Sequence, residues 1–82
     1  MDLDLVKLSR DNFKETVRLR RHFHMNPELS FKEVETPKYI AEYLTNLGIE
    51  VETGVGLNGV VGRLITDENK QTVALRADFD AL

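Results

Sequence analysis

Residues 72–82, with the sequence TVALRADFDAL, carry the pattern that decides the fold. Residues 73–75 form a short apolar run, long enough for a strand and too short to indicate a helix. Asp78 and Asp80 follow with one residue between them, and side chains two apart in an extended chain point to the same side. Open α/β sheets carry their chemistry at the carboxyl ends of their strands. The acidic pair therefore indicates the edge of a site whose other residues we expect outside this chain.

Length and composition narrow the class of protein. A chain of 82 residues forms at most one small domain. It has no cysteine, which excludes disulfides and cysteine-based zinc sites. Its net charge of -3 argues against a nucleic-acid-binding domain, because such domains are strongly basic. No apolar segment has the length of a signal peptide or a membrane span, so we expect a cytoplasmic protein without a membrane partner.

The first predicted helix covers residues 10–25, with Ser9 as its N-cap. Asn26 ends it, because a residue that precedes proline is pushed out of the α region. Between this helix and the next we expect an ordered connector with alternating buried anchors, namely Leu29, Phe31 and Val34.

The second predicted helix begins after Thr36 as its N-cap. Pro37 then takes the first helical position, where its missing N–H costs nothing. Gly48 is the natural end of this helix. The residues that share its apolar face are Ile40, Ala41, Leu44 and Leu47.

Three strands are predicted after the helices, over residues 49–53, 60–65 and 72–77. The turn at residues 67–70 suits an antiparallel hairpin between the last two. The glycine-rich connection at residues 54–59 lacks the Lys-Ser/Thr pair and the following helix of a phosphate-binding loop. The predicted class is α/β, with two helices followed by three strands of a mixed sheet.

The last two predicted strands are apolar on both faces, which is typical of strands covered on both sides. Two helices cover one face of such a sheet well, but hardly both. A complete small domain does not normally leave the other face bare. We therefore expect this chain to be the opening part of a larger domain.

The acidic pair has two interpretations. Asp78 and Asp80 can serve a metal site or acid–base chemistry, or they can be solvated charges at a strand end. Two carboxylates do not complete a site, since zinc takes about four ligands and calcium six to eight. Arg76 precedes them in an apolar strand, where it either pairs with a carboxylate from outside this chain or points outward.

His22 and His24 form a second candidate pair. Residues two apart on a helix do not share a face, so joint metal ligation is not expected. We expect one exposed histidine and one that is packed or caps the helix instead.

Several phrases of the sequence, in this order, resemble one known family. They are RRHFHMNPELSF at residues 20–31, TGVG at 53–56, GVV at 59–61 and ALRADFDAL at 74–82. The family is the metal-dependent amidohydrolases and carboxypeptidases related to hippurate hydrolase, N-acetyl-diaminopimelate deacetylase and the plant auxin-conjugate hydrolases. The resemblance covers residues 13–82, nearly the whole chain.

The resemblance implies that residues 1–82 are the N-terminal portion of an α/β/α catalytic domain. The implied reaction is hydrolysis of the amide bond of an N-acyl amino acid, with two divalent ions such as zinc, manganese or cobalt in the full-length parent. The resemblance also implies that a glutamate acts as the general base. The family's H-A-C-G-H-D ligand block lies outside this chain, so no metal ion is expected to bind to residues 1–82 alone.

One site residue is carried over from the resemblance. In the wider superfamily an H-x-D motif stands where this chain has residues 78–80, so Asp78 replaces the histidine. Asp80 matches the supporting aspartate, which orients a metal ligand without binding the ion itself.

Three readings of the function follow, and co-purification with a full-length homologue would favour the third, a non-enzymatic regulator that pairs with such a homologue. In the first, the chain is an amidohydrolase fragment that is inactive alone. In the second, it is a free-standing α/β binding module that forms a homo-oligomer through its bare sheet face. Cooperative unfolding at one defined oligomeric size would favour the second.

Overall fold

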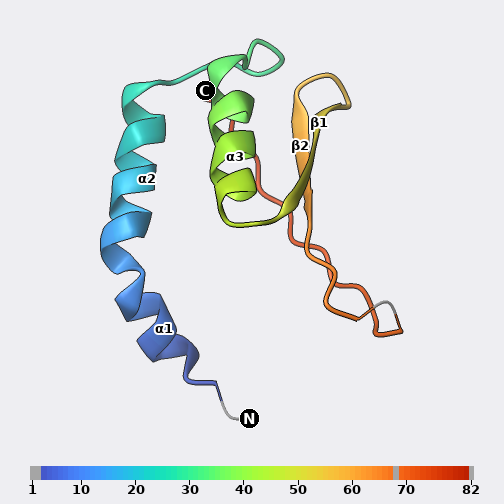
Figure 1. The fold of residues 1–82 in the computed structure, drawn as a ribbon. Helices are drawn as coiled ribbons and strands as arrows, with labels where there is room; N and C mark the ends of the chain where they lie inside the picture. The colour runs from blue at the N-terminus through green and yellow to red at the C-terminus, as the bar shows by residue number, and fades with distance from the viewer. Residues whose placement is uncertain (1–2, 68, 82) are drawn as a thin grey trace.

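Three helices and one β-hairpin make up the part of the chain that the structure describes (Figure 1). The structure is a computed structural model and describes residues 3–67 and 69–81. Its elements, in chain order, are α1 (Leu5–Asp11), α2 (Phe13–Met25), α3 (Glu35–Asn46), β1 (Glu50–Val55) and β2 (Gly59–Arg63). This composition confirms the predicted α/β class.

The helix predicted over residues 10–25 ends at Met25 as expected, but its predicted start is wrong, because α2 begins at Phe13 and the predicted N-cap, Ser9, lies inside a separate helix, α1. Asp4 begins α1, and its carboxylate accepts a hydrogen bond from the N–H of Lys7 at 3.1 Å. Asn12 separates α1 from α2, and its side-chain amide donates to the carbonyl of Leu8 at 2.8 Å. An asparagine side chain that bonds the backbone in this way competes with regular helix. None of the helices within residues 3–67 and 69–81 is long and apolar enough to cross a membrane.

Helix α3 begins earlier than predicted. Its first residue is Glu35, so Pro37 is the third helical residue and Thr36 is not the N-cap. Proline is tolerated there because the first N–H groups of a helix have no partner within it. The predicted end is confirmed, since Gly48 has a φ of 82° and its N–H donates to the carbonyl of Thr45 at 2.9 Å.

Strands β1 and β2 form an antiparallel hairpin in which Glu50 pairs with Arg63. The register shifts between Thr53 and Val55, so the hairpin contains a bulge. Gly59 lies opposite Val55, and a Cβ atom at Gly59 would stand 2.4 Å from the Val55 carbonyl oxygen. Because the two backbone segments lie this close together, only glycine fits at position 59. Helix α3 packs against both strands.

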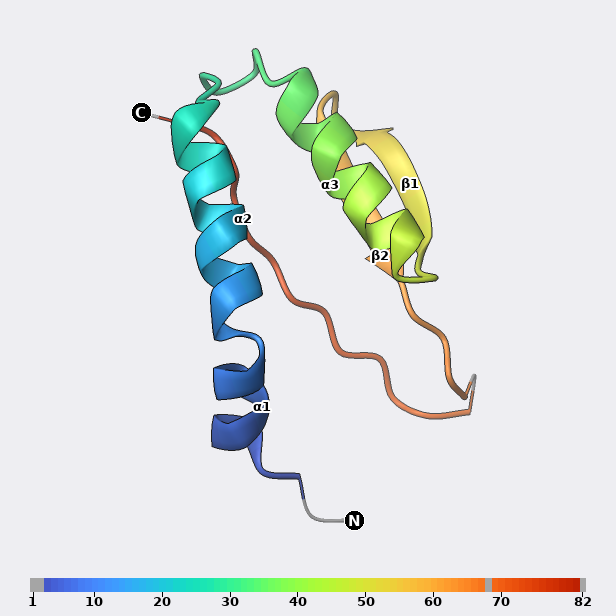
Figure 2. The ribbon, with the colours of Figure 1, turned by 60° about the vertical axis from the view of Figure 1, so that its left-hand side comes forward.

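The predicted third strand over residues 72–77 and the predicted mixed sheet are not confirmed. The sheet of the described residues has two strands, and residues 72–77 pair with neither of them. After β2 the chain runs away from the hairpin and returns past α2 to the connection between α2 and α3 (Figure 2). A strand is stabilised by its ladder to a neighbour, and this path brings none beside residues 72–77.

The described residues enclose no apolar core. No hydrophobic side chain among them is buried, and Leu29, Phe31 and Val34, the predicted anchors, are more than half exposed. The accessible surface is 7667 Å², whereas a compact protein of this mass exposes about 5000 Å². The radius of gyration is 14.6 Å, against about 12 Å for a compact domain of this length. The elements are therefore held by local contacts more than by a shared interior.

Candidate functional site

The C-terminal segment that carries Asp80 lies beside the connection between α2 and α3. The N–H of Ala81 donates to the main-chain carbonyl of Glu28 at 2.7 Å. Leu29 and Ala81 form an isolated parallel β-bridge. Both ribbon views show the segment ending at this connection (Figures 1 and 2). Asp80, next to Ala81, is exposed. The structure thus attaches the predicted site residue to a loop far from it in sequence.

The Glu28 carboxylate supplies the cap at the start of α3. Its Oε1 atom accepts from the N–H of Thr36 at 2.6 Å, and its Oε2 atom accepts from the N–H groups of Val34 and Glu35 at 3.0 and 3.1 Å. These donors belong to the first turn of a helix, where backbone N–H groups lack intrahelical partners. A negative charge there also faces the positive end of the helix dipole.

The same contacts lower the pKa of Glu28. The Thr36 hydroxyl contributes most, followed by the N–H groups of Thr36 and Val34, and together they hold the pKa at about 2 instead of the ordinary 4.5. Thr36 is buried, with 6% of its surface exposed. Glu28 is therefore ionised throughout the neutral range and holds its donors as a carboxylate.

Glu28 joins two parts of the molecule. Its carboxylate binds the N-terminus of α3, and its main-chain carbonyl binds the C-terminal segment. We call this arrangement the Glu28 junction: Glu28, the N–H groups of residues 34–36, and Ala81. Sequence reasoning missed it because Glu28 precedes α3 by seven residues, whereas the recognised capping patterns place the acid within three or four residues of the cap.

Asp78 does not share the environment of Asp80. It forms an ion pair with Arg76 at 3.1 Å, in which both side chains are strongly exposed. Of the two interpretations of Arg76, the structure shows the outward-pointing side chain, and its carboxylate partner lies two residues along the same chain. An exposed pair of this kind contributes little to stability.

His22 and His24 differ as expected. His22 stacks on Tyr39 of α3 with ring centroids 3.9 Å apart, while His24 is exposed. Arg18 donates to the Tyr39 hydroxyl at 3.0 Å. These contacts attach α2 to α3 and account for His22 by packing.

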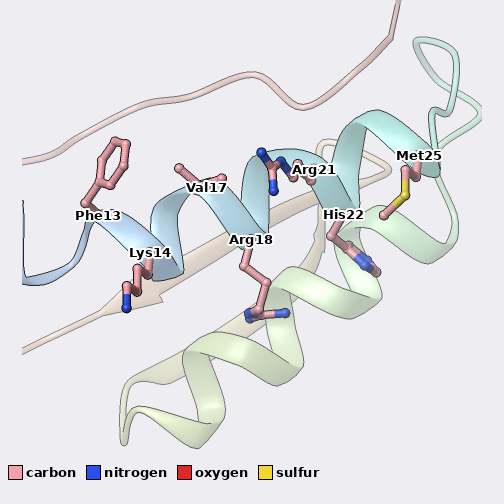
Figure 3. A pocket seen from close by; sticks show the side chains of 7 residues that line it. All are labelled: Phe13, Lys14, Val17, Arg18, Arg21, His22 and Met25. Atoms are coloured by element: carbon pink, nitrogen blue, oxygen red, sulfur yellow. The ribbon is translucent and has the colours of Figure 1, made fainter.

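A hollow runs along one side of α2 (Figure 3). Arg18 and His22 point from it toward α3, whereas Phe13 and Val17 point toward the C-terminal segment. The remaining lining residues are Lys14, Arg21 and Met25. Asp80 does not line this hollow, and neither do the residues of the Glu28 junction.

Glu33 is a second acidic residue that sequence reasoning missed. Only 8% of its surface is exposed. Its Oε2 atom accepts from the Asn58 side chain at 3.4 Å, and its Oε1 atom has no partner among the described residues. Its burial and pairing could not be read from a pattern of neighbouring residues, since Asn58 lies in the β1–β2 turn.

The described residues do not assemble a metal site by themselves. No group of three or more histidine or acidic residues within 3–67 and 69–81 is placed to hold a metal ion.

The chain is similar to several curated proteins. No protein-family model matches the chain, and no solved structure matches it significantly. Among curated proteins, the YhaA protein of Bacillus subtilis, named as an amidohydrolase, is 54% identical over 70 residues, which is 85% of this chain and 18% of that protein. Thermostable carboxypeptidase 2 of Saccharolobus solfataricus is 51% identical over 85 aligned positions, 98% of this chain and 22% of that protein. Hippurate hydrolase of Campylobacter jejuni is 43% identical over 68 residues, 83% of this chain and 18% of that protein.

The chain belongs to the amidohydrolase family that contains these relatives. This confirms the resemblance predicted from the sequence. The chain spans about a fifth of the length of the curated relatives that it matches. Membership in the amidohydrolase family therefore describes the residues in this chain, whereas the activity of a whole protein is a separate question.

Proposed function

We propose that the protein at its natural length is an amidohydrolase that cleaves the amide bond of N-acyl amino acids, and that residues 1–82 are one portion of its catalytic domain. The observation that carries this proposal is the identity of 43–54% to proteins named as an amidohydrolase, a carboxypeptidase and hippurate hydrolase. It extends over 83–98% of this chain.

The role proposed for this chain follows from the Glu28 junction. Asp80 offers an exposed carboxylate at the end of a segment held by one hydrogen bond to Glu28. A carboxylate in this position is suited to accept a hydrogen bond from the ring N–H of a neighbouring histidine and to fix its orientation. We propose zinc, manganese or cobalt as the metal cofactor of the protein at its natural length, with its ligands outside residues 1–82, as the resemblance to the amidohydrolase family implies.

The proposed domain also accounts for the loose structure of the chain. Val73 and Leu75 are 85% and 97% exposed. We propose that residues 72–77 form a strand of a mixed sheet once the rest of the α/β/α domain is present. Burial of these side chains would then supply the apolar contacts that the described residues lack.

The test is an assay of the protein at its natural length with added zinc, manganese or cobalt. One set of substrates consists of N-acetyl and N-benzoyl amino acids, and a second set consists of peptides with a free carboxyl terminus. We expect release of the free amino acid from the first set and slower release from the second. Faster release from the peptides would assign a carboxypeptidase, and no release from either set would refute the proposal.

A second candidate function rests on the exposed apolar residues of the C-terminal segment. A chain that leaves Val73 and Leu75 uncovered can bury them by pairing with a second copy. In that case the 82-residue chain would sediment as one defined oligomer and unfold cooperatively. A mixture of sizes with a broad transition would exclude this self-association module.

A further inference from the structure

We infer that Glu28 is a positioning residue that fixes the place of Asp80 through the Glu28 junction. The inference rests on the proposed function, since it concerns the same site, but it assigns a role to a residue that the resemblance to amidohydrolases leaves without one. Its evidence is the set of hydrogen bonds that Glu28 makes in two directions.

The first direction is toward α3. Three backbone N–H groups, those of residues 34–36, converge on the two oxygens of the Glu28 carboxylate at 2.6–3.1 Å. Hydrogen bonds from N–H groups to an ionised carboxylate are stronger than those between neutral groups. A side chain with three such bonds has little rotational freedom, so the backbone of Glu28 is held relative to α3.

The second direction is toward Asp80. The carbonyl of Glu28 accepts from Ala81 at 2.7 Å, which is a short bond for an N–H donor. Among the described residues, this is the single backbone hydrogen bond between residues 71–81 and any other segment. Asp80 and Ala81 are consecutive, so their Cα atoms are about 3.8 Å apart. A shift of the Glu28 backbone is therefore transmitted to Asp80 across one peptide unit.

The chemical consequence is a loss of rate when the junction is loosened. A displacement of about 1 Å in a supporting group can cost about 100-fold in rate. Removal of residues that orient a metal ligand typically costs about 10- to 100-fold. Glu28→Ala keeps the main-chain carbonyl but removes the cap that holds it, so we expect kcat to fall about 10-fold or more with little change in KM.

The experiment is a double-mutant cycle in the protein at its natural length. The kcat and KM for N-benzoylglycine are measured for the unmodified protein, Glu28→Ala, Asp80→Ala and the double variant. If Glu28 acts through Asp80, Glu28→Ala lowers kcat by less than about twofold when Asp80 has already been replaced by alanine. The reason is that the effects of residues that act as a unit are non-additive. Multiplication of the two losses in the double variant would overturn the inference and leave Glu28 a purely structural role.

Glu42→Ala is the matched control. Glu42 is an exposed carboxylate of α3, the helix that Glu28 caps, and has no side-chain hydrogen bond among the described residues, so kcat should not change. Glu28→Gln is the conservative variant, and its amide oxygen should restore part of the lost kcat. An equal loss in Glu42→Ala and Glu28→Ala would overturn the inference.

Failure of the inference is separable from failure of the proposed function. Hydrogen exchange of the Ala81 amide reports on the junction without any substrate, and Glu28→Ala should speed it about 10-fold or more while Glu42→Ala leaves it unchanged. If the unmodified protein hydrolyses no amide, the proposed function and the positioning role both fall, even where this exchange result stands. If the protein is active and Ala81 exchanges at the same rate in all variants, only the positioning role falls.

Discussion

Two acidic residues near the start of α3 show how different the surroundings of a glutamate can be. Glu28 has donors on both oxygens, whereas Glu33 is buried with one weak donor and one oxygen that has no partner among the described residues. An ionised carboxylate stabilises a structure when its hydrogen bonds replace those lost with water, and it destabilises the structure when they do not. The two residues should therefore respond in opposite ways to removal of charge.

Protonation of Glu28 should weaken the fold in acid. Its pKa is lowered from 4.5 to about 2 in the folded protein by the Thr36 hydroxyl and the backbone N–H groups. The folded state then binds fewer protons than the unfolded state, so the stabilisation is complete above about pH 4.5 and is lost as the pH falls toward 2. Denaturant midpoints measured across this range should fall less steeply in Glu28→Gln than in the unmodified protein. Parallel curves would contradict the assignment.

Removal of the charge on Glu33 should be tolerated. Glu33→Gln keeps the size of the side chain and an oxygen for Asn58, and it replaces the second oxygen, which has no partner among the described residues, with an amide group. We expect the free energy of unfolding to stay constant or rise by up to about 1 kcal/mol. Glu42→Gln, at an exposed position of α3, provides the comparison. A clear loss of stability in Glu33→Gln alone would mean that both oxygens of Glu33 have donors.

Among the helices and strands, features that depend on neighbouring residues were predicted correctly, whereas features that depend on residues far apart in sequence were not. The end of α3 at Gly48 and the positions of β1 and β2 follow from neighbouring residues, and the structure confirms them. The cap of α3 comes from Glu28, outside the range of local patterns. The predicted strand over residues 72–77 has strand-like composition, but no neighbour lies beside it within the described residues. Similarly, the motif that contains Asp80 could be recognised in the sequence. The hydrogen bond between Ala81 and Glu28 could not be predicted, because it depends on the path of the chain in three dimensions.

Gly59→Ala should disrupt the hairpin. The added Cβ atom would stand 2.4 Å from the Val55 carbonyl oxygen, and a backbone atom cannot move aside without changing the bulge. We expect a loss of about 1–3 kcal/mol in the free energy of unfolding. Gly62→Ala is the control, because its Cβ would first meet side-chain atoms, at 3.1 Å on Ile49 and 3.3 Å on Leu44, and the nearest backbone atom, the Glu50 carbonyl oxygen, is 4.0 Å away. Equal effects of the two substitutions would contradict the bulge geometry.

Tyr39→Ala should separate α2 from α3. The substitution removes the ring that stacks on His22 and the hydroxyl that accepts from Arg18. Loss of the aromatic pair should cost about 1 kcal/mol. Tyr39→Phe keeps the stack and loses only the hydroxyl, so its effect should be smaller. Hydrogen exchange of the α2 amides in each variant measures this, and equal exchange in all of them would show that other contacts hold the helices together.

Across the whole molecule, the described residues do not enclose a hydrophobic core. Their surface of 7667 Å² and the absence of a buried hydrophobic side chain within 3–67 and 69–81 indicate that apolar burial contributes little to their stability. The identity to proteins about five times as long explains this if the missing contacts come from the rest of the domain. In that account, catalysis and the completion of the core depend on the same additional residues.

The most direct test of this account compares two forms of the protein in one assay. Release of glycine from N-benzoylglycine is measured for the protein at its natural length and for residues 1–82 alone, each with the same added zinc, manganese or cobalt. The account predicts turnover by the first and none above the buffer control by the second. Turnover by residues 1–82 alone would contradict it, as would the absence of amide hydrolysis by the protein at its natural length.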